Sequence, residues 1–361
     1  MIPLVVDLET EWRGGQSQAL LLLKGLYERG HPAELVVARG SVLGHRARKE
    51  GIYVHSVSRR MLRLRAAAGI RELLSDTRIE LVHVNEPHAL TAAWLAGAQK
   101  KVPLLVSRRV AYPVRPGLFA RRRYLAAHRI LAISRFVKDS LLGSGILPEL
   151  IKLVYEGVEV APPVTPEMRS QARQRWRVRD QETLLGCVGY LLPEKGQEFL
   201  IRALPAVRTR FPNVRLLLAG DGPCRSQLES LCREQGLEET VIFAGFVKDV
   251  WQVYAALDVF VFPSLAEPLG TSLLAAMAWG LPVLAVASGG VPEYVGHEET
   301  GLLVPHPAPD LFAAGLIRLQ SEPELAKRLG ASAREHIQQE FSAPHMVENT
   351  LKVYEEALGN S

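Results

Sequence analysis

Short apolar runs rich in β-branched residues alternate with longer helical patterns along the chain. In the first part these runs are IPLVV (2–6), AELVVA (33–38), IYVHSV (52–57), LVHV (81–84), PLLVS (103–107), RILAIS (129–134) and IKLVY (151–155). Alternating strands and helices imply right-handed crossovers and a parallel sheet that is buried on both faces. This part of the chain therefore predicts a doubly wound α/β domain.

The same rhythm restarts in the second part, which ends in two helical patterns. Its apolar runs are LLGCVGY (184–190), VRLLLAG (214–220), VIFAGF (241–246), VFVFP (259–263), PVLAVA (282–287) and GLLVP (301–305). Between the two series, VEVAPPVTPEM (158–168) is proline-rich and lacks periodicity, which is typical of an interdomain linker. Because 361 residues exceed the size at which one core usually keeps growing, two domains are predicted.

The net charge of +5 is unevenly distributed. Residues 1–160 hold 25 Lys and Arg against 14 Asp and Glu, a net charge of +11, and the remainder carries −6. The arginines cluster in RRMLRLR (59–65), SRR (107–109) and RRR (121–123). Such clusters indicate an anionic partner such as a phospholipid headgroup, a phosphorylated glycan or nucleic acid. A solvated basic face is the alternative for any single cluster.

The cysteines and the N-terminus indicate a cytoplasmic location. Cys187, Cys224 and Cys232 are odd in number and lack metal-ligand spacing, as expected for thiols in a reducing compartment. The opening MIPLVVDLETEW reaches acidic residues too early for a signal peptide, and no apolar run is long enough to span a bilayer.

Loops that follow strands are the expected ligand sites, because ligands of doubly wound folds bind at the carboxyl ends of the strands. Gly14 and Gly15 stand before the first helix, where they permit close backbone approach to an anion; a plain strand-to-helix turn is the alternative. In the second part, Lys195 and Gly196 occupy the turn between a strand and a helix. A lysine there can reach a diphosphate.

A dinucleotide fingerprint is not found in these loops. GCVGYL (186–191) has the wrong glycine spacing, and AGDGPCR (219–225) has Arg225 where the third glycine would stand. An NAD enzyme is therefore disfavoured.

The segment EPLGTSLLAAMAWG (267–280) places a carboxylate beside the start of a buried helix. Thr271 and Ser272 can donate backbone and hydroxyl hydrogen bonds to a phosphate at that helix start. Glu267 would repel the same phosphate, so a neutral polyol is its plausible partner. Phosphate together with sugar hydroxyls describes a nucleotide sugar.

Together these motifs resemble the retaining nucleotide-sugar glycosyltransferases of the GT-B fold, specifically glycosyltransferase family four. The ordered set comprises GG before the first helix, LVHVNEPHAL (81–90), LAISRFVKDSLL with IKLVYEGVE (131–159), VGYLLPEKG, LLLAGDGP, FAGFVKDV, FPSLAEPLGTSLLAAMAWGLPVLAVASGGVPEYV and TGLLV. The resemblance implies an α/β fold of two Rossmann-like, doubly wound parallel-sheet domains facing across a cleft. Residues 1–162 would bind the acceptor, with a helix at about 341–361 packing back on them, and residues 163–340 would bind the donor.

The resemblance also implies roles for single residues. Glu267 would accept hydrogen bonds from the donor sugar, and Lys195 would neutralise the leaving diphosphate. The remaining donor contacts would come from Gly14, Gly15, Phe246, Val247, Leu269, Gly270 and Thr271, the phenylalanine and valine lying near the base. Family members generally need no metal, and no cofactor is expected beyond the nucleotide-diphosphate sugar.

Three positions depart from the family pattern. Ala275 stands where a second glutamate usually binds the ribose, and Tyr190 stands where an arginine commonly supports the lysine. Arg109 replaces a histidine near the sugar; it cannot act as a base, but it can bind an acceptor phosphate or carboxylate. We therefore count Arg109 with Glu267 and Lys195 as catalytic candidates, and Arg108, Arg109 and Ser134 as acceptor-binding candidates.

The leading hypothesis is a retaining glycosyltransferase that moves a sugar, of hexose type, from a nucleotide-diphosphate donor, such as a UDP-sugar, to a hydroxyl of a glycan or lipid-linked acceptor. Similar SRR loops occur in bacterial relatives that build lipopolysaccharide and other surface glycans, and the basic first part fits a peripheral enzyme on an anionic membrane. The alternative is a non-catalytic sugar-nucleotide or glycan-binding protein of the same fold. A nucleic-acid-binding protein is disfavoured, since no aromatic-interleaved basic platform supports it.

Overall fold

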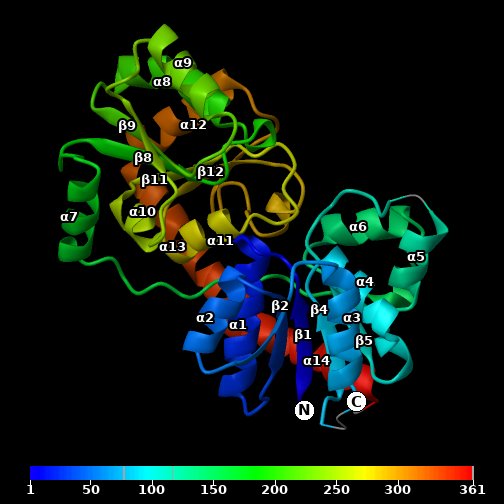
Figure 1. Cartoon of the computed structure of the whole chain (residues 1–361). Helices are drawn as coiled ribbons and strands as arrows, with labels where there is room; N and C mark the ends of the chain where they lie inside the picture. Colours follow the sequence, from blue (N-terminus) through cyan, green and yellow to red (C-terminus); the bar gives the residue numbers. More distant parts are fainter. Residues whose placement is uncertain (76–77, 116, 360–361) are drawn as a thin grey trace. The chain divides into compact units, whose positions relative to one another are not determined.

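The computed structural model describes residues 1–75, 78–115 and 117–359 (Figure 1). Its contacts divide the chain into two compact units, Met1–Gly157 with Ser342–Ser361 and Val158–Phe341. The division thus falls after Gly157 rather than after residue 162. The segment that follows Gly157 is tied to the second unit, because the Val158 amide donates to the Phe341 carbonyl at 2.9 Å.

The first unit is built on a seven-stranded parallel sheet in the order β3-β2-β1-β4-β5-β6-β7. Every one of the seven apolar runs forms a strand, as predicted. The strands are β1 (Pro3–Asp7), β2 (Glu34–Ala38), β3 (Tyr53–Val57), β4 (Leu81–Val84), β5 (Leu104–Arg108), β6 (Arg129–Ala132) and β7 (Ile151–Leu153). The helices are α1 (Gly14–Glu28), α2 (Val42–Lys49), α3 (Leu62–Leu73), α4 (Pro87–Ala96), α5 (Leu118–Leu125), α6 (Arg135–Gly143) and, from the end of the chain, α14 (Ala343–Leu358).

Helix α14 packs against α1 and shares a hydrophobic core with the sheet of the first unit. A buried polar chain fixes its register: His83 Nδ1 lies 2.6 Å from the Tyr354 hydroxyl, and His83 Nε2 lies 2.8 Å from Ser107 Oγ. Burial lowers the pKa of His83 to about 3, so the imidazole stays neutral and can bridge two hydroxyls without carrying a charge. The last helix is therefore specifically seated on the first sheet.

The second unit holds a six-stranded parallel sheet in the order β10-β9-β8-β11-β12-β13. Its strands, again one for each predicted run, are β8 (Thr183–Val188), β9 (Val214–Ala219), β10 (Val241–Gly245), β11 (Val259–Phe262), β12 (Val283–Val286) and β13 (Leu302–Val304). Its helices are α7 (Pro166–Arg175), α8 (Gln197–Arg210), α9 (Arg225–Glu234), α10 (Trp251–Ala256), α11 (Thr271–Ala278), α12 (Pro309–Ser321) and α13 (Pro323–Glu340). The predicted α/β class with two Rossmann-like parallel-sheet units is confirmed.

The predicted linker is shorter than its proline content indicated. Helix α7 begins at Pro166, inside the segment expected to be irregular. Thr165 caps it by accepting a hydrogen bond from the Met168 amide at 3.2 Å, and proline at the first helical position needs no amide partner. The third proline of the segment therefore starts a helix instead of extending the linker.

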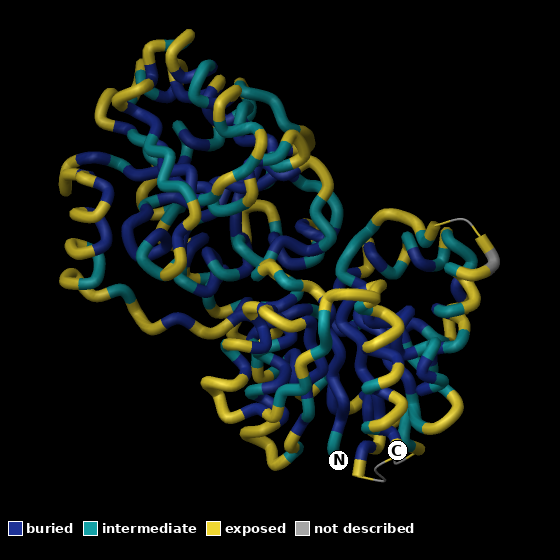
Figure 2. Tube along the Cα trace, viewed as in Figure 1, coloured by how far each residue is buried: buried dark blue, intermediate teal, exposed yellow. Residues whose placement is uncertain are grey.

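Strand order reverses direction once in each sheet, between β1 and β4 and between β8 and β11. The central strands of both sheets are buried, whereas the edge strand β3 and the outer faces of the helices are partly exposed (Figure 2). Loops at such a switch point splay apart and leave room for a ligand. The loops after β1, β4, β8 and β11 are therefore the places to look for a site.

Candidate active site

Two loops meet at the switch point of the second unit. The loop after β8 runs through Lys195 to Gly196, whose φ of +67° favours glycine. A side chain at Gly196 would come within 2.4 Å of the Pro263 carbonyl, in the loop after β11. The Leu265 amide also donates to the Glu194 carbonyl at 2.8 Å. Both loops are thus held together by their backbones.

The structure brings the two strongest predicted residues into contact. Lys195 Nζ donates to Glu267 Oε2 at 2.5 Å, and Ser264 Oγ donates to the same oxygen at 2.9 Å. The lysine side chain is 26% exposed. A cation that reaches solvent while paired with a carboxylate can exchange that partner for an incoming phosphate.

The loop that carries Glu267 is braced from the next strand. The Gly290 amide donates to the Glu267 carbonyl at 2.9 Å, Ser288 Oγ donates to the Ser264 carbonyl at 2.8 Å, and the Tyr294 hydroxyl donates to the Leu269 carbonyl at 2.7 Å. The sequence did not single out Ser264, Ser288 or Tyr294. Ser264 and Ser288 could have been found from the sequence, because each is a polar residue that closely follows a predicted strand. Neighbouring parallel strands end at the same edge of the sheet, so such residues lie near one another.

Helix α11 begins as the sequence predicted. Gly270 is its N-cap with a φ of +99°, and the first helical hydrogen bonds are donated by Leu273 and Leu274 to the Gly270 carbonyl. The amides of Thr271 and Ser272 therefore lie ahead of the helical ladder, where an anion can accept from them. Ala275 lies one turn after Thr271 on the same side of the helix and is partly exposed.

The other predicted donor residues of this unit stand at the same sheet edge. Tyr190 follows β8 with an exposed side chain. Phe246 follows β10 and is 70% exposed, whereas the adjacent Val247 is buried. An exposed aromatic ring beside a buried aliphatic residue suits stacking against a base. The base-binding role of Phe246 and Val247 stays a prediction.

In the first unit Gly14 and Gly15 form the first turn of α1 instead of preceding it. The Gly15 carbonyl accepts from Asn85 Nδ2 at 3.1 Å. Asn85 in turn contacts Arg109, which is paired with Glu156 at 2.7 Å. Residues from four separate segments meet here, and sequence reasoning had named only the glycines and Arg109.

The remaining acceptor candidates are occupied by internal contacts. Arg108 is buried, and its guanidinium donates to the Tyr124 hydroxyl at 3.0 Å and to the Tyr112 carbonyl. Ser134 is fully buried and caps α6 by accepting from the Val137 amide at 3.1 Å. Contact of either residue with an acceptor stays a prediction.

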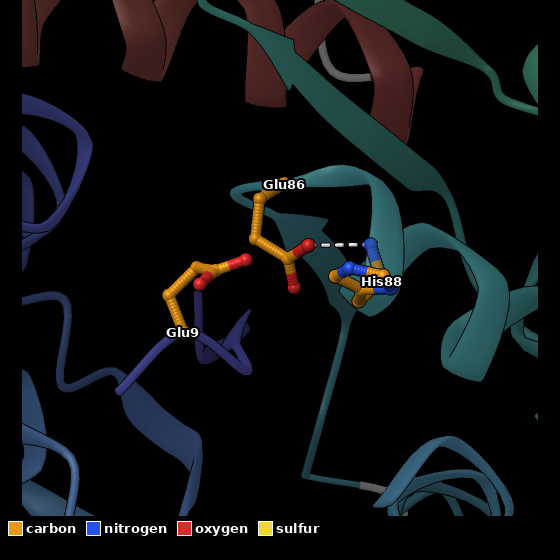
Figure 3. A group of neighbouring side chains, drawn as sticks. All are labelled: Glu9, Glu86 and His88. Carbon is orange, nitrogen blue, oxygen red and sulfur yellow. Dashed lines mark hydrogen bonds between the residues drawn. The ribbon is translucent and has the colours of Figure 1, made fainter. Parts of the chain in front are cut away.

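Among the described residues, Glu9, Glu86 and His88 form a group whose ligand atoms lie within 4.8 Å of one another (Figure 3). Both carboxylate oxygens of Glu86 already accept hydrogen bonds, from the Leu8 amide at 3.2 Å, from the Ala89 amide at 2.6 Å and from the His88 amide. Burial raises the pKa of Glu86 to about 7, so the carboxyl is partly protonated at neutral pH. Glu86 acts as the N-cap of α4, a poor arrangement for a cation ligand.

Two family models match the chain, Glycosyl transferases group 1 over residues 168–336 and Glycosyltransferase Family 4 over residues 12–161. The D-inositol 3-phosphate glycosyltransferase of Saccharomonospora viridis is 30% identical over 307 residues, which cover 77% of this chain and 70% of that protein. The chain belongs to glycosyltransferase family four. Its predicted family membership is thereby confirmed.

Other relatives are matched over shorter segments. A GDP-mannose-dependent alpha-(1-6)-phosphatidylinositol monomannoside mannosyltransferase of Mycobacterium tuberculosis is 35% identical over 181 residues, or 48% of this chain and 47% of that protein. Further relatives are matched over 54 to 60% of their length. Anabaena HepE in complex with UDP and glucose has a TM-score of 0.84 at 23% identity, covering 98% of both chains. That likeness shows the GT-B fold.

Proposed function

We propose that this protein transfers a sugar from a nucleotide-diphosphate donor to a hydroxyl of a glycan or lipid-linked acceptor, with retention of configuration. The observation that carries the proposal is the contact of Lys195 with Glu267 directly before the start of α11. Lys195 and the amides of Thr271 and Ser272 supply positive charge for a diphosphate. Glu267 and Ser264 supply acceptors and a donor for sugar hydroxyls.

The proposed mechanism uses no dedicated general base. The bond between the anomeric carbon and the diphosphate oxygen breaks, and the acceptor oxygen bonds to that carbon on the same face of an oxocarbenium-like sugar. The acceptor proton passes to the departing diphosphate. The protein orients the reactants and stabilises the leaving charge with Lys195 and the helix start, so a metal is not needed.

The related proteins point to one of two bases in the donor nucleotide, guanine or uracil. The name of the mycobacterial relative specifies GDP-mannose and a phosphatidylinositol mannoside, and HepE was solved with UDP. We propose a lipid-linked acceptor and a role in the synthesis of bacterial surface glycans such as lipopolysaccharide, at the cytoplasmic face of the membrane.

A thermal-shift and turnover series tests the function. UDP or GDP, and the matching UDP-glucose or GDP-mannose, are expected to raise the melting temperature in proportion to the logarithm of concentration over affinity. The stabilising nucleotide sugar is then expected to be hydrolysed slowly in the absence of acceptor, as measured by release of nucleoside diphosphate. Stabilisation with no hydrolysis or transfer would favour the non-catalytic alternative, and no stabilisation by any of the four would contradict the proposal.

The arginine-rich segment around α3 supports association with an anionic membrane. Met61 is 62% exposed between basic residues, and Leu64 and Phe119 are also exposed. An open surface hollow of about 420 Å³ is lined by Met61, Leu62, Arg63, Leu64 and His88. Among the described residues no helix is both long and apolar enough to cross a bilayer. Apolar side chains flanked by arginines match the boundary of a bilayer with anionic headgroups.

Charge reversal at Arg60 and Arg63 is expected to weaken binding to vesicles of phosphatidylcholine with phosphatidylglycerol. Each basic residue near such a surface contributes about 1 kcal/mol, so reversing two charges lowers the partition coefficient by at least tenfold. Vesicle flotation at low and high salt measures the loss. The matched control is reversal of the exposed Arg210 and Arg233 of the second unit. Equal loss in both double variants, or no flotation of the wild type, would contradict the membrane proposal.

A further inference from the structure

Arg109 occupies an enclosed position beside the switch point of the first unit. It directly follows β5, and its side chain is 15% exposed. Nε donates to Glu156 Oε1 at 2.7 Å, and Nη1 donates to the Asn85 carbonyl at 3.1 Å and to Asn85 Oδ1. The guanidinium is therefore committed to two partners of its own unit.

The contact with Arg109 determines which way the Asn85 carboxamide points. A guanidinium can only donate, so the Asn85 oxygen must face Arg109 and the amide nitrogen must face away. That nitrogen donates to Asp7 Oδ2 at 2.5 Å and to the Gly15 carbonyl at 3.1 Å. Asn85 thus transmits the position of Arg109 to the first turn of α1.

The same turn is held from its other side. Asp7 Oδ2 also accepts from Gln16 Nε2 at 2.9 Å, and Gln16 Oε1 accepts from the Arg13 amide at 3.2 Å. A side chain added at Gly15 would lie 3.5 Å from Arg109 Cδ, so the turn lies close to the arginine stem. The glycine turn is therefore clamped by Asn85 at the Gly15 carbonyl and by Asp7 through the Gln16 side chain.

We infer that Arg109 is a positioning residue, which fixes the Gly14–Gly15 turn through Asn85, and that it does not act by contacting the acceptor. The inference rests on the proposed function and on the family resemblance, which implies that Gly14 and Gly15 contact the donor. An arginine suits the role because its fork holds the carboxylate of Glu156 and both oxygens of Asn85 at once. A lysine has a single terminal nitrogen, so it cannot hold Glu156 and Asn85 through two separate nitrogen atoms.

Two substitutions test the inference in the full chain. Arg109→Lys removes the fork, and Asn85→Asp keeps the oxygen that faces Arg109 but replaces the donor to Gly15 with an acceptor. Both variants are expected to accelerate amide hydrogen exchange in residues 14–18. Both are also expected to raise the KM for hydrolysis of UDP-glucose or GDP-mannose, whichever the wild type uses, about tenfold or more. The matched control is Arg71→Lys, since Arg71 on α3 also donates to backbone carbonyls, those of Leu95 and Ala96 at the end of α4.

Hydrolysis separates positioning from acceptor contact, because water replaces the acceptor. If Arg109 acts by binding the acceptor, Arg109→Lys leaves the hydrolysis KM unchanged, and the inference is overturned. It is equally overturned if exchange in residues 14–18 matches the wild type in both variants. If the wild type hydrolyses neither donor, the proposed function fails by itself, and the exchange measurement still decides whether the clamp exists. Unfolding curves of each variant establish that the comparison is made between folded proteins.

Discussion

Replacement of Lys195 by alanine is expected to reduce kcat for transfer by roughly a hundredfold to a thousandfold, the usual effect of removing one group that stabilises developing charge. The lysine is the cation that the structure places beside the start of α11, and its charge matters most when the diphosphate departs. The fold is expected to persist. Glu267 is 13% exposed and keeps its hydrogen bond from Ser264 at 2.9 Å, so loss of the lysine is expected to lower the melting temperature without unfolding the chain.

Steady-state kinetics with the donor identified by thermal shift measures this effect, and melting curves report on folding. Lys327→Ala is the matched control, because Lys327 is exposed on α13. Glu267→Gln is expected to lower transfer as well, since a neutral amide is a weaker acceptor for sugar hydroxyls. Wild-type turnover in both Lys195→Ala and Glu267→Gln would remove these residues from the site and leave the family membership untouched.

The fold was predictable because its signal is local and repeated. Thirteen apolar runs predict thirteen strands, and the helical patterns between them require parallel pairing. The contact of Lys195 with Glu267 follows from the same topology, since β8 and β11 are neighbours and both residues stand in the loops after them. Placing each residue after a strand was sufficient to bring the pair together.

The surroundings of Arg109 were not predictable in this way. Its partner Glu156 lies 47 residues further along the chain. Asn85 lies in the motif LVHVNEPHAL, in which the sequence alone assigned no role to any single residue. The family resemblance separated Arg109 from Arg108, but the spacing of the residues did not reveal the partners of either. A strand turns successive side chains to opposite sides, however, so Arg108 reaches Tyr124 while Arg109 reaches Glu156. The partners of Arg109 could be found only once the ends of β4, β5 and β7 were placed in space.

Substitution of Gly289 by alanine is expected to lower both stability and transfer, because this glycine lets two loops touch. Its φ is +58°, and an added Cβ would lie 2.0 Å from the Glu267 carbonyl oxygen. That distance is far below the van der Waals contact distance. Because the atom that is met is a backbone oxygen and not a flexible side chain, the loop that carries Glu267 must move. A shift of about 1 Å in that loop costs up to a hundredfold in rate.

The matched control for this prediction is Gly236→Ala. Gly236 has a similar φ of +62°, but an added Cβ would meet nothing within 4 Å. Both substitutions incur the left-handed backbone strain of roughly 1 kcal/mol, and only Gly289→Ala adds the collision. Thermal unfolding is therefore expected to show a larger loss for Gly289→Ala, and the donor KM is expected to rise in that variant alone. Equal melting temperatures and equal KM values in the two variants would mean that the contact between Gly289 and Glu267 does not position the carboxylate.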